Sequence, residues 1–216
     1  MNLPDLNISK GESFGLVGNN GAGKTTFFSL ILDLIEATEG LVTSKEENVK
    51  QSEHWKRYTG SYLDERFLID FLTPEEYFDF VRKLYGVTVS EYNEFLERFE
   101  DFFQGEILEK KKYIRDLSKG NQKKVGIAAA LMSKPEVLVL DEPFPHLDPS
   151  SVIRLKKILK EYHTNHQATV LISSHDLNHV TEVCERIAIL ERGSIIHDLK
   201  TDESTLEKLH NYFAVE

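Results

Sequence analysis

The chain of 216 residues contains 40% hydrophobic residues and carries a formal net charge of −10. This length can bury one sizeable core, and the acidic balance argues against a nucleic-acid-binding surface. The single cysteine, Cys184, excludes an internal disulfide and a zinc site built from several thiolates, and we expect it to be a small buried apolar side chain. No apolar run approaches the roughly 20 residues that span a bilayer, and the start around Asn2 and Asp5 lacks a signal-peptide pattern, so a cytoplasmic chain is expected.

Apolar stretches with strand character alternate with helical patterns along the chain. The predicted strands are residues 14–17, 58–63, 137–140, 169–172 and 187–190. The predicted helices among them are residues 25–35, 149–162 and 177–185. Asp148 suits the cap of the second of these helices, and Pro149 suits its first turn. Strands that alternate with helices predict an α/β fold with a mostly parallel sheet.

The middle of the chain has a different pattern. Two aromatic-rich helical stretches, residues 74–85 and 90–103, follow each other with only Gly86 and a short turn between them. We therefore predict a helical region over residues 66–134. Its aromatic stripe consists of Tyr77, Phe78, Phe95, Phe99 and Phe102. Such a stripe can meet a partner helix, but aromatic residues at helical spacing are more often part of the core.

A phosphate-binding pattern follows the first predicted strand: glycine, four residues, glycine, lysine and threonine, running directly into a helix. The glycines let the backbone curl so that its N–H groups point inward, and the helix N-terminus adds a positive dipole. Lys24 is expected to reach the β- and γ-phosphates, Thr25 to contact Mg²⁺, and Thr26 to support the loop. The predicted nucleotide-binding residues of this loop are Gly18, Asn19, Asn20, Gly21, Ala22, Gly23, Lys24, Thr25 and Thr26.

Two adjacent carboxylates, Asp141 and Glu142, end the continuously apolar stretch at residues 137–140. Such a stretch is typical of a central parallel strand that is covered on both faces. Asp141 can complete the shell of Mg²⁺, and Glu142 can orient or deprotonate the water that attacks the γ-phosphorus. Alone, the pair would be explained equally well as a cap for the next turn. Together with the phosphate loop, it predicts ATP hydrolysis.

A third motif, Leu117-Ser118-Lys119-Gly120-Asn121-Gln122, resembles the LSGGQ signature of ABC transporter ATP-binding subunits. The sequence departs from that signature, with Lys119 in place of the first glycine and Asn121 inserted before the glutamine. The resemblance implies that Ser118 and Gly120 begin a helix whose N-terminus binds the γ-phosphate held by an opposite subunit.

Three further segments resemble the same family in the family's order. His175, in a Ser-Ser-His-Asp segment, resembles the switch histidine that contacts the γ-phosphate. The segment from His146 to Pro149 resembles the D-loop, where the family more often has glycine at the position of His146. The acidic pair Asp64 and Glu65 lies where a family glutamine usually reaches toward Mg²⁺ and the membrane partner. Either acid can substitute for that glutamine, and Asp64 is taken as the metal contact.

The resemblance implies the fold and the assembly. The expected fold is a P-loop NTPase core of the ABC ATPase type, made of residues 1–65 and 135–216, with an inserted α-helical subdomain over residues 66–134. Two subunits, identical or different, would close head to tail over ATP and Mg²⁺ and would drive a separate permease at the inner face of the cell membrane. Family members usually have an edge strand and an adenine-stacking aromatic residue before the phosphate loop, and this sequence begins close to that loop.

Other functions stay open at the level of sequence. A soluble ABC-type ATPase that acts on nucleic acid or ribosomes usually carries coiled-coil insertions or a second ATPase module, which this acidic chain does not show. A nucleotide-binding module without hydrolysis would not need Lys24, Asp141, Glu142 and His175 together. The loose signature and the acidic pair at Asp64 lean toward export, by analogy alone.

Overall fold

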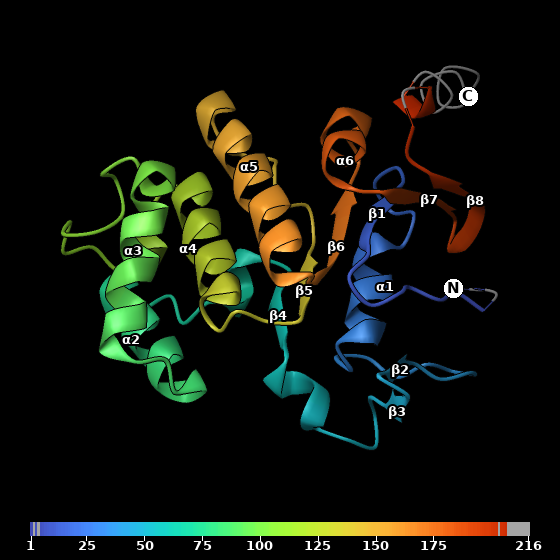
Figure 1. Cartoon of the computed structure of the whole chain (residues 1–216), viewed down its shortest axis with the longest axis horizontal. Helices are drawn as coiled ribbons and strands as arrows, with labels where there is room; N and C mark the ends of the chain where they lie inside the picture. Colours follow the sequence, from blue (N-terminus) through green and yellow to red (C-terminus); the bar gives the residue numbers. More distant parts are fainter. Residues whose placement is uncertain (2, 4, 203, 207–216) are drawn as a thin grey trace.

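The computed structural model describes residues 1, 3, 5–202 and 204–206. Its main sheet has six strands in the order β4-β5-β6-β1-β7-β8 (Figure 1). These strands are β1 (Ser13–Val17), β4 (Thr59–Tyr62), β5 (Val137–Leu140), β6 (Thr169–Ser174), β7 (Arg186–Glu191) and β8 (Ser194–Lys200). All neighbouring strands are parallel except β7 and β8. The predicted α/β fold with a mostly parallel sheet is confirmed.

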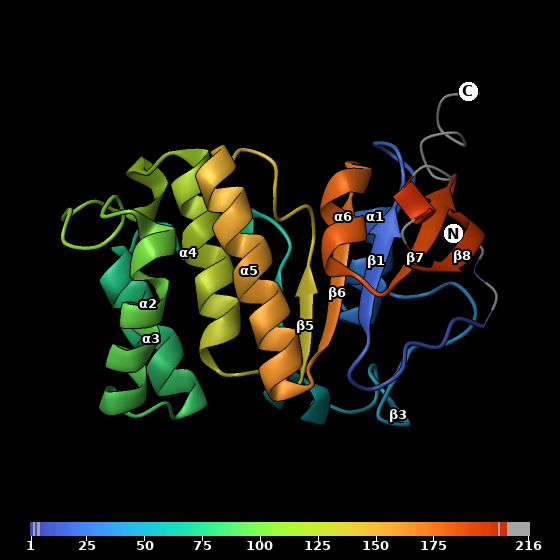
Figure 2. The ribbon, with the colours of Figure 1, turned by 45° about the horizontal axis from the view of Figure 1, so that its top comes forward.

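The helices lie on both faces of this sheet (Figures 1 and 2). They are α1 (Lys24–Ile31), α2 (Pro74–Tyr85), α3 (Val89–Phe103), α4 (Lys119–Met132), α5 (Pro149–His166) and α6 (Leu177–Val183). Short elements complete the chain: the hairpin β2 (Thr43–Ser44) and β3 (Glu47–Asn48), and the 3₁₀ turns η1 (His54–Arg57), η2 (Glu65–Phe67) and η3 (Ile114–Asp116). Within the described residues, no helix is both long and apolar enough to cross a bilayer.

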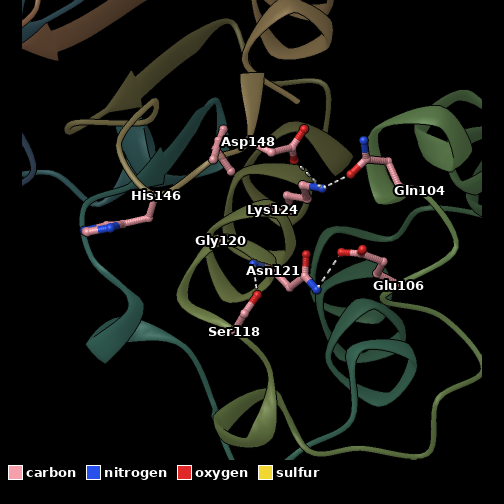
Figure 3. Close-up of a pocket in the computed structure, with 9 residues that line it drawn as sticks. Gln104, Glu106, Ser118, Gly120, Asn121, Lys124, His146 and Asp148 are labelled. Atoms are coloured by element: carbon pink, nitrogen blue, oxygen red, sulfur yellow. Dashed lines mark hydrogen bonds and ion pairs between the residues drawn. The ribbon is translucent and has the colours of Figure 1, made fainter. Parts of the chain in front are cut away.

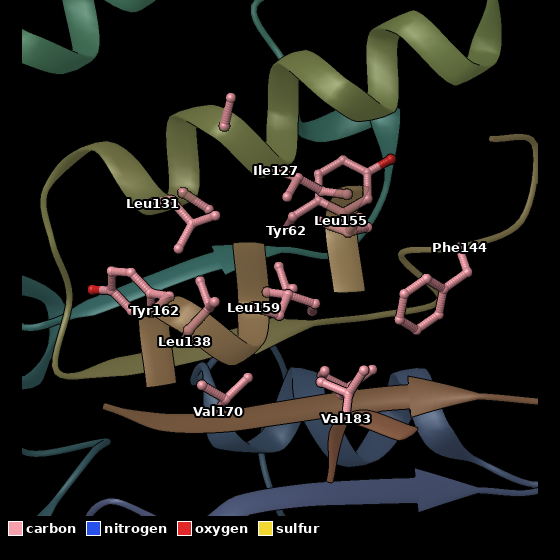
Figure 4. Packing of buried hydrophobic residues seen from close by; sticks show 14 of the residues in the cluster. Tyr62, Ile127, Leu131, Leu138, Phe144, Leu155, Leu159, Tyr162, Val170 and Val183 are labelled. Atoms are coloured by element: carbon pink, nitrogen blue, oxygen red, sulfur yellow. The ribbon is translucent and has the colours of Figure 1, made fainter. Parts of the chain in front are cut away.

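Alternation along the strands divides the core into two clusters. In β5, Leu138 and Leu140 pack into the larger cluster with α4, α5 and α6, whereas Val139 packs with α1 on the other face. Successive side chains of a strand point to opposite faces of a sheet, so a continuously apolar strand supplies both clusters. Figure 4 shows the larger cluster, in which Ile127 and Leu131 of α4 lie above Tyr62 and Leu138 of the strands. Cys184 is 3% exposed, and burial raises the pKa of its thiol, as expected for a buried apolar side chain.

The helices α2, α3 and α4 gather beside the sheet at the β4 end (Figure 1). A capping box begins each of the first two helices, formed by Thr73 and Glu76 for α2 and by Thr88 and Glu91 for α3. In each box the threonine side chain accepts from the backbone N–H of the glutamate, and the glutamate side chain accepts from the backbone N–H of the threonine. Between them, Gly86 ends α2 in the left-handed conformation with φ 68°. These local signals explain why the chain forms two successive helices here without a strand.

The aromatic stripe is part of the core, as the helical spacing favours. Phe78, Phe99 and Phe102 are buried, and Tyr77 and Phe95 pack partly buried against them. Their cluster is continuous with the apolar residues of the sheet. The division of the chain into a core of residues 1–65 and 135–216 and a helical subdomain of residues 66–134 stays a prediction.

Several bounds differ from the sequence prediction. Helix α1 ends at Ile31 rather than at residue 35, because the N–H of Leu34 donates to Ser29 O and Asp33 adopts a left-handed φ of 51°. Helix α5 continues past residue 162 to His166, where Gln167 ends it with φ 49°. Strand β8 was not predicted, since its exposed residues lack the apolar alternation of the other strands.

Candidate nucleotide-binding site

The predicted phosphate loop connects β1 to the N-terminus of α1. Gly18 needs to be glycine because a Cβ there would lie 2.3 Å from the backbone oxygen of Leu190. Gly23 has a φ of 110°, which favours glycine, and occupies the N-cap of α1. Among the described residues, no side chain caps this helix N-terminus and none in its first turn is acidic. Its backbone N–H groups and its positive dipole end suit a polyphosphate.

Lys24 lies inside this loop and is only 6% exposed. Its Nζ donates to the backbone oxygen of Gly18 at 2.7 Å and forms an ion pair with Glu142 Oε1 at 3.1 Å. A buried ammonium group needs such partners, since burial without them is costly. The lysine is therefore held between the loop and the acidic end of β5.

Asp141 sits at the end of β5 and is 4% exposed. The hydroxyl of Thr25 donates to Asp141 Oδ2 at 2.5 Å, and the hydroxyl of Ser173, from β6, donates to Asp141 Oδ1. Burial raises the pKa of Asp141, while the bonds from Ser173 and Thr25 oppose that change. Ser173 was part of a motif in the sequence, but nothing in the pattern predicted that its side chain would hold Asp141.

Glu142 adopts a left-handed backbone with φ 45° and points its carboxylate between the side chains of Lys24 and His175. Oε1 faces Lys24, and Oε2 lies 2.9 Å from Nδ1 of His175. The side chain of His175 is 47% exposed and that of Glu142 is 25% exposed, so both can be reached from solvent. The structure thus brings together the three residues that the sequence predicts to be catalytic.

The predicted metal contacts fall into two groups. Thr25 and Asp141 touch each other beside the phosphate loop, and a hydroxyl with one carboxylate suits Mg²⁺, which is usually held by few protein groups and by substrate phosphates. In the described part of the chain, no cluster of three or more His, Cys, Asp or Glu side chains could hold a metal by itself. Asp64 instead caps η2, where its Oδ1 accepts from the backbone N–H and from Nε of Arg66, both at 2.8 Å. Burial raises the pKa of Asp64, but these bonds outweigh it and the net pKa is lowered.

The signature segment forms a second, open pocket of about 520 Å³ (Figure 3). Ser118 is the N-cap of α4 and accepts from the backbone N–H of Asn121 at 3.2 Å, so the predicted helix start is confirmed. Gly120 lies against the D-loop, where a Cβ would come within 2.5 Å of the backbone oxygen of His146. His146 has a left-handed φ of 68°, in accord with the glycine that the resemblance implies there. The lining residues are Gln104, Glu106, Ser118, Gly120, Asn121, Lys124, His146, Leu147 and Asp148.

Lys124 connects two walls of the pocket, near Ser118 and Gly120. Its Nζ donates to Gln104 Oε1 at 2.8 Å and lies 3.7 Å from Asp148 Oδ2. Hydrogen bonds from Ser150 and Ser151 hold the pKa of Asp148 well below its usual range. The sequence did not indicate Lys124 or Gln104, because their contact joins residues of α4 and of the α3 terminus.

The phosphate loop at the end of a parallel strand, the acidic end of β5 and the signature helix define a P-loop nucleotide-binding protein of the ABC ATPase fold. The model of the ABC transporter family matches residues 1–145. This chain belongs to the ABC transporter family.

Individual proteins agree with this assignment. An uncharacterized ABC transporter ATP-binding protein, YhaQ of Bacillus subtilis, is 38% identical over 205 residues, which cover 92% of this chain and 65% of that relative. The chain therefore spans less than two thirds of that relative's length. A solved ATP-binding subunit of an ABC transporter is 27% identical with a TM-score of 0.79, over 95% of this chain and 83% of that one. A dimeric ATP-binding cassette in a post-hydrolysis state bound to ADP and Pi is 25% identical, with a TM-score of 0.79 over 91% and 88% of the two chains.

Proposed function

We propose that this chain binds and hydrolyses ATP within a head-to-tail dimer and drives transport by a separate membrane permease. Glu142 carries the proposal, because its carboxylate is held between Lys24 and His175 beside the phosphate loop. A carboxylate in that place can orient and deprotonate an attacking water. The related dimeric cassette bound to ADP and Pi supports both hydrolysis and dimerisation.

Each residue has a proposed role in the reaction. The loop from Gly18 to Thr26 binds the phosphates through its backbone N–H groups, and Lys24 neutralises charge on the β- and γ-phosphates. His175 contacts the γ-phosphate and orients Glu142. When Mg²⁺ is bound, it neutralises phosphate charge, and Thr25 and Asp141 are the residues that would hold it.

The signature pocket supplies the argument for a dimer. Its lining residues come from the end of α3, the start of α4 and the segment before α5, a different part of the surface from the phosphate loop. Ser118 and the N-terminus of α4 offer donors that suit a phosphate, as does the phosphate loop itself. ATP bound between the phosphate loop of one subunit and this pocket of another would favour the closed dimer, and ADP would not.

The assembly is proposed to lie at the inner face of the cell membrane, attached through the permease. The coupling contact is placed at Asp64 and Glu65, at the end of β4. Either a second copy of this chain or a different ATP-binding subunit completes the dimer, and the permease selects the transported substrate.

The test is Mg²⁺-dependent ATP hydrolysis by the purified chain and by its Glu142→Gln variant. General-base assistance is worth about 10²- to 10⁴-fold, so the variant should lose hydrolysis by that factor and should accumulate as an ATP-bound dimer. Glu161→Gln is the matched control, since Glu161 pairs with Lys157 on the exposed side of α5. Hydrolysis that survives in Glu142→Gln would contradict the proposal.

A further inference from the structure

Lys123 is a buried lysine of α4 that the proposed reaction leaves without a role. It is 5% exposed, although a buried ammonium group is costly unless polar partners surround it. Its Nζ donates to the backbone oxygen of Glu142 at 2.7 Å. This bond joins the signature helix directly to the main chain of the proposed general base.

The backbone of Glu142 is held from both sides. Its N–H donates to Ser173 Oγ at 2.9 Å, and its carbonyl accepts from Lys123. With φ 45°, Glu142 adopts a conformation that costs a residue other than glycine on the order of 1 kcal/mol and persists only where neighbours hold it. The two bonds therefore fix the direction in which the Glu142 carboxylate points.

Lys123 also lies near Tyr62, the last residue of β4. Its Nζ lies 5.9 Å from the ring centroid of Tyr62, and one turn further along α4 a Cβ on Gly126 would lie 2.4 Å from Tyr62 Cδ2. This glycine lets α4 approach β4 closely. Burial lowers the pKa of Lys123, and the nearby carboxylates, first among them Glu65, oppose that change.

The neighbouring lysine provides a contrast. Lys124 is also buried, but its Nζ reaches Gln104 and Asp148 in the signature pocket. Two successive lysines on one helix thus serve two separate sites, one beneath the signature and one beneath Glu142. The side of α4 that carries Lys123 belongs to the hydrolytic site.

We propose that Lys123 is a positioning residue that fixes the main chain of Glu142 and joins it to the end of β4 at Tyr62. Movement at the end of β4 by a membrane partner would then change the rate of hydrolysis rather than the affinity for ATP. The inference rests on the proposed function, because it assigns Lys123 to the same hydrolytic site.

The test compares kcat with ATP affinity in Lys123→Met and in a matched control, Lys134→Met. Lys134 pairs with Glu91 on the surface just beyond the end of α4. A misplaced catalytic group can cost about 100-fold in rate, so kcat of Lys123→Met should fall by roughly 10- to 100-fold while the Kd for ATP stays within about twofold. Lys123→Arg, which keeps a charged donor, should recover part of kcat.

Each outcome decides the inference. A kcat of Lys123→Met within about twofold of the parent chain, or an equal loss in Lys134→Met, would overturn it. If Lys123→Met fails to fold, Lys123→Arg and Lys123→Gln replace it, and equal kcat values for these two would also overturn it. If the parent chain hydrolyses ATP and Glu142→Gln does not, the proposed function stands and such a result overturns only the role of Lys123. If the parent chain does not hydrolyse ATP, both proposals are overturned.

Discussion

The proposed hydrolytic site and the signature pocket differ in how they are held together. Around Glu142, side chains from the phosphate loop, β5 and the end of β6 already touch one another, through Lys24, His175 and Ser173. The signature pocket is open, and its bonds stay within its own wall, as between Asn121 Nδ2 and Glu106 Oε2 at 3.2 Å (Figure 3). One region is assembled within a single chain, whereas the other presents donors outward.

This difference suggests that one chain can bind nucleotide by itself, whereas the signature pocket acts only in the pairing of two chains. A site that is already assembled can bind nucleotide in one chain, because its groups are oriented before the ligand arrives. An open pocket at a helix N-terminus gains its partner only when a phosphate is brought to it. The comparison therefore predicts separate effects for changes in the two regions.

The largest expected separation comes from Lys24→Ala and Gly120→Ala. Loss of a hydrogen bond to a charged group costs about 1.5–3 kcal/mol, so Lys24→Ala should weaken ATP binding by about 10- to 100-fold. Gly120→Ala should leave binding by the single chain unchanged and weaken ATP-driven dimerisation by at least about tenfold, because its Cβ would displace the D-loop at His146. Calorimetry measures ATP binding by the single chain, and sedimentation in the analytical ultracentrifuge measures ATP-driven dimerisation. An equal loss of ATP binding in both variants would break the comparison.

A second prediction concerns Ser173. Ser173→Ala removes the donor to Asp141 and the acceptor for the N–H of Glu142. Buried polar groups left without a partner cost about 1–3 kcal/mol, so the free energy of unfolding should fall by that amount and kcat should fall with it. Chemical denaturation measures the first effect. Ser204→Ala, on an exposed turn, is the control, and equal stability of the two variants would contradict the account.

The third prediction is that the free energy of unfolding depends on pH through the carboxyl group of Asp141. Because burial raises its pKa above the ordinary 3.8, the folded chain binds this proton more tightly than the unfolded chain does. The stabilisation is present below the ordinary pKa and is lost as pH rises through the raised value. The stability advantage of the parent chain over Asp141→Asn should therefore shrink as pH rises above the ordinary pKa of Asp141, 3.8, as followed by denaturation in the absence of nucleotide. An advantage that grows with pH would contradict it.

The smallest expected effect is at His146. Its φ of 68° is costly for histidine and not for glycine, so His146→Gly should raise the free energy of unfolding by up to about 1 kcal/mol. Thermal denaturation measures the change. A matched substitution at His197, which lies on β8, should give no such gain. A destabilised His146→Gly variant would show that the histidine ring makes contacts that outweigh its backbone strain.

Local signals in the sequence predicted most of the sheet. The continuously apolar stretch at residues 137–140 became β5 with the bounds expected, since such a stretch can be buried on both faces. The helices predicted over residues 74–85 and 90–103 became α2 and α3, and the capping boxes that begin them appear only in the structure. Strand β8 was not predicted because its side chains are largely exposed, and it is held in the sheet by its antiparallel pairing with β7.

The composition of the hydrolytic site was predictable, and the way its residues are held was not. Lys24, Asp141, Glu142 and His175 each stand in a motif whose spacing points to phosphate chemistry. The contacts of Ser173 with Asp141 and of Lys123 with Glu142 join residues from separate elements, so no local pattern indicates them. The expected metal contact at Asp64 stays untested, and its side chain binds Arg66 here.

The most direct test of a site shared between two chains is a mixing experiment with two impaired variants. Lys24→Ala disables the phosphate loop, and Ser118→Arg blocks the signature pocket. In a head-to-tail dimer of the two, one interface joins an intact phosphate loop to an intact signature. The account predicts that ATP turnover of the mixture rises above that of either variant alone. Turnover no higher than the average of the separate variants, or a fully active Ser118→Arg variant, would contradict it.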